Sequence, residues 1–176
     1  MMSASKERFS VGIKQFGWFL PPFFAVYLLE DNPDVKTILS RILPFFVTVT
    51  LLFGPFLLWD AKSFIEDTMS YVGGAVDYYN FPLNGVKGLG FANFVITSGV
   101  VGSIRGYFPF WILQAAFTLP VIGYLMLCQR RNNAISLMLL SFGVSLFTAS
   151  YFSRFMHDNH LTLVASILAM SAFIDE

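Results

Sequence analysis

The chain has 176 residues, of which 56% are hydrophobic and only 12% are charged, and 21 of them are phenylalanine. A composition this apolar is typical of an integral membrane protein rather than of a water-soluble domain. The 11 basic residues balance the 11 acidic ones, which argues against nucleic acid as a partner. Cys128 is the single cysteine, so the chain alone can form neither an internal disulfide nor a thiolate metal site.

Apolar stretches follow one another along the chain, beginning with residues 11–29 and 42–59. Each has close to the ~20 residues that a helix needs to cross a bilayer. Prolines interrupt both stretches, so kinked helices are expected. Residues 60–84 differ because charged and aromatic side chains alternate there. This pattern predicts an amphipathic helix and loop at the membrane interface.

Residues 88–104 are apolar but short and rich in glycine. They either form a sixth span or enter the membrane and return on the same side. Three further spans are expected at residues 110–128, 134–152 and 161–174. The predicted fold is therefore a single all-α integral membrane domain with five to six transmembrane helices and an amphipathic interfacial segment. Residues 88–104 are the sixth helix if they span the membrane and a re-entrant segment if they do not.

Two orientations remain open. Arg130 and Arg131 form the one adjacent basic pair in a tight loop. If the positive-inside rule places this pair in the cytoplasm, the polar residues 153–160 lie on the outer side. A count of lysine and arginine over all loops favours the opposite orientation of a five-span chain.

A compact polar cluster, residues 153–160, separates the last two expected spans. Polar groups at membrane depth are costly, so such clusters often serve catalysis or bind lipid phosphate. His157 and His160 are spaced as two metal ligands on one helix could be. Because no cysteine or third ligand accompanies them, we predict no metal site.

Small residues predict close helix packing, within the chain or with a partner chain. The glycines expected to serve this purpose are Gly99, Gly102 and Gly143.

Three segments, in this order, resemble motifs of one enzyme family. Residues 13–21 resemble a Lys-Gln-x-x-Trp-x-x-x-Pro helix opening. Residues 54–67 resemble a Pro-Phe-x-x-Trp-(Asp/Asn)-x-x-x-Phe-x-x-Asp segment that leads into an extracytoplasmic loop. Residues 153–161 resemble Ser-Arg-Phe-x-His-Asp-Asn-Tyr-Leu, except that His160 stands where the family tends to have tyrosine. The family is that of the prokaryotic multi-span (GT-C type) polyprenyl-phosphate-dependent glycosyltransferases, in particular their mannosyltransferase-like group.

The resemblance implies the C-terminal half of such an enzyme, because the family carries its essential acidic residue in a loop before the Lys-Gln helix. It therefore favours a non-catalytic accessory or structural subunit of a larger complex in the prokaryotic inner membrane. Other integral membrane subunits and lipids are the expected partners. The alternative is one half of a split glycosyltransferase, which transfers sugar from polyprenyl phosphate on the extracytoplasmic side.

If the chain takes part in catalysis, an acid or base is required. The candidates for it are Asp60, Asp67 and His157. The candidates for binding the phosphate of a polyprenyl phosphate or another lipid are Lys14, Arg154, His157 and Asn159. No other cofactor is expected. These candidates also have simpler explanations. A lysine near the membrane boundary extends its charged end to the headgroups, and carboxylates are common on the solvated face of an interfacial helix.

Overall fold

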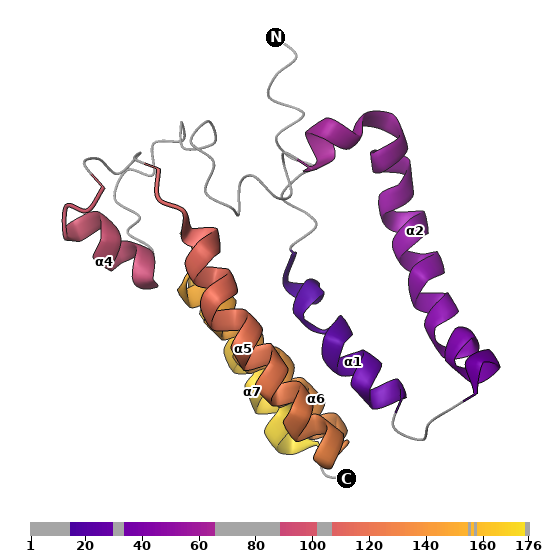
Figure 1. The fold of residues 1–176 in the computed structure, drawn as a ribbon. Coiled ribbons are helices and arrows are strands. Elements are labelled where there is room, and N and C mark those ends of the chain that lie inside the picture. Colours follow the sequence, from indigo (N-terminus) through magenta and orange to yellow (C-terminus); the bar gives the residue numbers. More distant parts are fainter. Residues whose placement is uncertain are drawn as a thin grey trace.

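The computed structural model describes residues 15–29, 34–65, 89–101, 107–154, 156 and 158–174. Helices are the only regular secondary structure within these residues, as the sequence predicts (Figure 1). In chain order they are the 3-10 helix η3 (Gln15–Phe19), α1 (Pro21–Leu28), α2 (Val35–Ile65), α4 (Phe91–Thr97), α5 (Phe110–Arg131), α6 (Ile135–Tyr151) and α7 (Asp158–Phe173).

Two of the described helices, α2 and α5, are long and apolar enough to cross a membrane. The 22 residues of α5 extend over ~33 Å, which matches a hydrocarbon core of ~30 Å. Helix α2 has 31 residues, with a kink at Asp60, and none of them is buried. The other described helices are shorter: α6 has 17 residues, α7 has 16 and α1 has eight. Length and composition therefore support two of the expected five to six spans.

The glycine-rich segment expected at residues 88–104 contains only a short helix in its described part. Helix α4 has seven residues and therefore extends over ~10 Å. This is about a third of the thickness that a span has to cover. Helix α4 alone therefore does not cross a bilayer.

Helices α5, α6 and α7 lie side by side and alternate in direction (Figure 1). Gly143 brings α6 close to α7, since a Cβ at this position would lie 2.8 Å from Leu168 Cδ2. Beside this contact, a small core forms from Leu146 on α6 and from Val164 and Ile167 on α7. The close approach lets short apolar side chains fill the interface between these two helices.

Side chains from two other parts of the chain cap the C-terminus of α1. The Tyr27 carbonyl accepts a hydrogen bond from Asn133 Nδ2 at 3.0 Å, and the Leu28 carbonyl accepts one from Arg41 Nη1 at 2.8 Å. Carbonyls in the last turn of a helix have no partner within the helix, so these bonds satisfy groups that are costly to leave unpaired. Gln129 Nε2 adds a bond to the Phe23 carbonyl at 3.0 Å. Helix α1 is thereby fixed to both α5 and α2.

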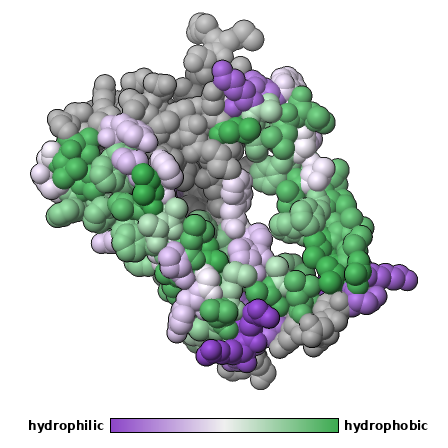
Figure 2. Space-filling model, in the orientation of Figure 1, coloured by the Kyte–Doolittle hydropathy of each residue, from purple (hydrophilic) through white to green (hydrophobic). Residues whose placement is uncertain are grey.

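Hydrophobic residues cover most of the visible described surface between two opposite ends where hydrophilic residues gather (Figure 2). One of these ends holds the start of α2 and the end of α5 (Figure 1). Four basic residues belong to these helix ends, namely Lys36, Arg41, Arg130 and Arg131. An apolar band between two polar ends is the surface that a bilayer requires.

Candidate functional site

The described residues of the polar cluster predicted at residues 153–160 lie in the connection between α6 and α7 and in the first turn of α7. Arg154 is only 5% exposed. Ser153 is also buried, and its hydroxyl donates a hydrogen bond to the Ser150 carbonyl at 2.7 Å. In contrast, Asp158 and Asn159 are exposed in the first turn of α7. Two of the predicted phosphate-binding residues, Arg154 and Asn159, therefore lie in different environments.

Residues 89 and 90, just before α4, cover this connection. The Leu89 backbone N–H donates to the Met156 carbonyl at 2.9 Å. A Cβ on Gly90 would lie 2.4 Å from the Tyr151 carbonyl oxygen, a distance that no side chain can adopt. Glycine is therefore required here because two backbone segments touch. The contact explains how Met156 becomes buried, with 2% of its surface exposed.

The ring of Phe152 anchors the same connection to two other helices. It stacks on Phe117 of α5, with ring centroids 4.2 Å apart and planes 6° apart. It also lies 5.7 Å from the ring of Phe91 in α4. Such aromatic pairs stabilise by about 0.5–1.5 kcal/mol beyond their buried area. Apolar contacts thus hold the polar segment in place.

Asp60, a candidate acid or base, has a structural role in α2. Its backbone leaves the helical conformation, with φ −154° and ψ 83°. Its Oδ1 accepts the Ser63 backbone N–H at 3.0 Å, and its Oδ2 accepts the Ser63 hydroxyl at 2.7 Å. This is the geometry of an N-cap, which restarts the helix after the break. The segment expected at the interface from residue 60 thus begins, in its described part, with a short helical stretch as far as Ile65 that the break at Asp60 separates from the rest of α2.

The remaining predicted site residues are distributed as follows. Gly143 is buried against α7, as described above, whereas Gly99 is exposed in the turn after α4. Gly99 has a φ of 75°, which favours glycine for the turn rather than for packing. Lys14, Asp67, Gly102 and His157 lie outside the described residues. Among the residues that are described, no group of three histidine, cysteine or acidic side chains is placed to hold a metal ion.

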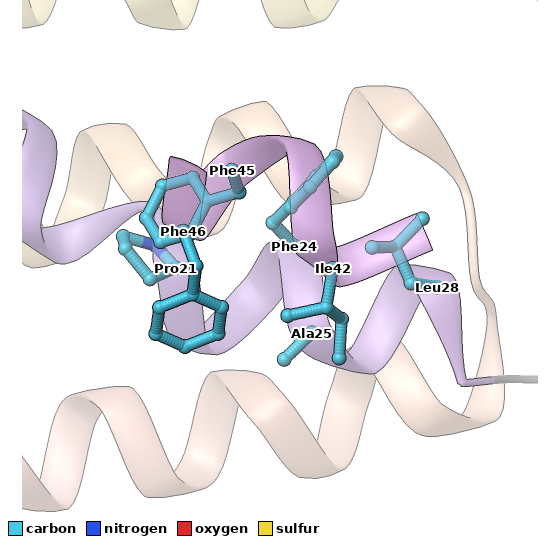
Figure 3. Close-up of a pocket in the computed structure, with 7 residues that line it drawn as sticks. All are labelled: Pro21, Phe24, Ala25, Leu28, Ile42, Phe45 and Phe46. Atoms are coloured by element: carbon cyan, nitrogen blue, oxygen red, sulfur yellow. The ribbon is translucent and has the colours of Figure 1, made fainter. Parts of the chain in front are cut away.

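An apolar groove lies between α1 and α2, a feature that sequence patterns did not indicate (Figure 3). Its volume is ≈ 180 Å³. The residues that line it are Pro21, Phe24, Ala25, Leu28, Ile42, Phe45 and Phe46. None of these side chains ionises or donates a hydrogen bond, so the groove suits hydrocarbon and not acid or base chemistry.

No protein family, curated protein or solved structure matches this chain. The described part of the chain is all-helical. Two of its helices are long and apolar enough to cross a membrane.

Proposed function

We propose that the chain is an integral membrane protein and serves as a non-catalytic accessory or structural subunit of a larger membrane complex. Helices α1, α2, α5, α6 and α7 cross the bilayer in this proposal, with η3 extending α1, and α4 stays at one side. The observation that carries the proposal is α2, which exposes apolar side chains along its whole length and buries none of its residues. Such a surface requires lipid or the helices of another subunit.

The described polar residues favour a structural role over a catalytic one. Asp60 accepts the two hydrogen bonds that restart its own helix. Arg154 is buried in the α6–α7 connection, and Asn159 is exposed in the first turn of α7. Catalysis requires an acid or base that converges with binding groups on one cavity. The described groove is instead lined entirely by apolar residues.

The resemblance to GT-C glycosyltransferases supports a descent of this fold from such enzymes and a place in a prokaryotic inner membrane. It also supports the second candidate function, one half of a split polyprenyl-phosphate-dependent glycosyltransferase. The observation that favours this alternative is the burial of Arg154 within the Ser-Arg-Phe segment. A buried guanidinium is costly and is often retained for function.

The test is purification of the tagged protein from its native membrane in mild detergent, followed by mass spectrometry of the retained proteins and lipids. Unrelated membrane subunits in fixed ratio are the expected result. A bound polyprenyl phosphate together with a glycosyltransferase-like partner would establish the split enzyme instead. Recovery of the chain with neither would contradict both functions.

Variants separate the two functions further. Asp60→Asn keeps a residue suited to an N-cap but removes the carboxylate, and His157→Gln removes a titratable ring. For an accessory subunit, we expect both variants to leave the amount and the activity of the host assembly unchanged. Gly143→Phe, which forces α6 away from α7, should reduce the amount of assembly recovered. The opposite ranking would favour the enzyme.

A further inference from the structure

We infer that the groove between α1 and α2 holds an acyl chain of a zwitterionic membrane phospholipid with an ammonium headgroup, of the phosphatidylethanolamine class. The inference rests on the proposed membrane residence of the chain. It concerns the groove and the helix ends beside it, away from the polar cluster of the α6–α7 connection.

The groove itself fits hydrocarbon. Side chains from α1 and α2 face each other across it (Figure 3). Two of the rings that line it remain open to the outside, since Phe45 is 41% exposed and Phe46 is 58% exposed. A volume of ≈ 180 Å³ accommodates a segment of one acyl chain rather than a whole ligand. A chain in this position covers apolar surface that the protein itself leaves uncovered.

A phosphate-binding group lies at one end of the groove. Arg41 precedes the lining residue Ile42, and its Nη1 donates to the carbonyl of another lining residue, Leu28, at 2.8 Å. The side chain is exposed. A guanidinium has five N–H donors, and this bond uses one of them. The remaining donors suit the oxygens of a phosphodiester whose acyl chain enters the groove.

A carboxylate follows on the same face of α2. Asp34 lies seven residues before Arg41, which is two turns or ~10 Å along the axis. Helical side chains point toward the N-terminus of their helix, so the long arginine side chain shortens this separation. The Thr37 hydroxyl donates to the carboxylate and keeps the pKa of Asp34 below its ordinary value, so it is negative at neutral pH.

The order of these groups identifies the lipid class. On the face of α2 that carries Arg41 and Asp34, apolar lining is followed toward the N-terminus by a positive and then a negative side chain. Phosphatidylethanolamine presents the complementary order, with acyl chain, phosphate and ammonium. Phosphatidylglycerol has no ammonium group for Asp34. Lys36 lies two residues after Asp34 and therefore projects from another side of α2. The pairing of Asp34 with an ammonium group therefore favours the ethanolamine headgroup.

The experiment uses the full chain in micelles that contain equal amounts of phosphatidylethanolamine and phosphatidylglycerol, with retained lipid measured by native mass spectrometry. We expect wild-type protein to retain phosphatidylethanolamine roughly fivefold over phosphatidylglycerol. Ala25→Phe fills the groove and should release both lipids. Its matched control, Ala165→Phe on the exposed side of α7, should retain them.

Two charge variants test the headgroup without filling the groove. Arg41→Gln removes the charge and the guanidinium donors, and it should retain roughly fivefold less of either lipid. Arg130→Gln, at the same end of the molecule, is the control and should change nothing. Asp34→Asn preserves the N-cap and should bring the two lipids to equal retention.

The inference and the proposed function fail in different ways. If an alkaline carbonate wash strips the protein from native membranes, the proposed membrane residence is wrong and the inference falls with it. If the protein stays in the membrane but retains both lipids equally, the inference alone is overturned. The same conclusion follows if Ala25→Phe and Ala165→Phe retain equal amounts of lipid.

Discussion

Asp34 directly precedes α2 and shows how one residue sets a helix boundary. Its backbone carbonyl accepts the Ile38 N–H at 3.0 Å, while its carboxylate accepts the Thr37 hydroxyl and nearby backbone N–H groups. The Thr37 bond is the largest cause of the lowered pKa of Asp34. These bonds favour the charged carboxylate and satisfy donors that the helix itself leaves unpaired.

We expect Thr37→Val to raise the pKa of Asp34 toward its ordinary value of 3.8, because the variant removes the main donor to the charged form. In the wild type the lowered pKa means that the cap stabilises α2 above the ordinary pKa and weakens as pH falls through the lowered one. Carboxyl NMR titration of Asp34 measures the shift. A titration that is identical in the two proteins would contradict a hydrogen bond from Thr37.

Asn133 provides a second test at the scale of single residues. Its amide donates to the Tyr27 carbonyl in the last turn of α1, a group that has no partner within that helix. Asn133→Ala should lower the free energy of unfolding in detergent by about 1 kcal/mol, measured by thermal or chemical denaturation. Asn132→Ala changes an exposed neighbour and is the control. Equal losses from both variants would rule out a specific contribution from the bond to α1.

The contact between α6 and α7 is a feature of whole elements, and Gly143 determines it. Any side chain there meets Leu168 Cδ2 at 2.8 Å and Ile167 Cγ2 at 3.2 Å. Gly143→Val should therefore lower the free energy of unfolding by about 1–3 kcal/mol. Gly123→Val on α5 is the matched control, because nothing lies within 4 Å of the new Cβ. There, stability should stay unchanged or rise slightly, since valine favours a helix more than glycine does.

Denaturation of the two glycine variants side by side measures this difference. A loss at Gly123 as large as that at Gly143 would show that the helices do not meet as described. Gly90 also has to lack a side chain, because its backbone lies close to the Tyr151 carbonyl. In both places the absence of a side chain brings two elements together.

At the scale of the molecule, the exposed apolar surface of α2 determines how the chain meets its surroundings. Leu52 lies near the middle of α2 and is exposed. Leu52→Asp should oppose membrane insertion of α2 by about 3 kcal/mol, as measured by glycosylation mapping in microsomes. Val35→Asp, at the first residue of the helix, should insert as the wild type does because it reaches the interface. Equal insertion of both variants would show that α2 does not span the membrane.

The sequence alone predicted the helical class and the apolar segments that became α2 and α5, because hydropathy and length are properties of neighbouring residues. It did not predict that α2 would extend from Val35 to Ile65, beyond the expected residues 42–59. Asp34 accepts hydrogen bonds at the start of α2, and Asp60 breaks the helix and caps the turns that follow it. The resemblance made Asp60 a catalytic candidate. The hydrogen bonds from Ser63 to Asp60 show instead that Asp60 caps a helix.

Sequence by itself thus determined that this protein is apolar, helical and suited to a bilayer, since such patterns follow from local composition. Only the tertiary structure decided how Asn133 reaches Tyr27, 106 residues away in the chain, and how α1 and α2 enclose an apolar groove. It also decided that Arg154 is buried while Asn159 is exposed. These features depend on which surfaces pack together. Packing brings together residues that are far apart in the chain, and such contacts leave no periodic pattern in the local sequence.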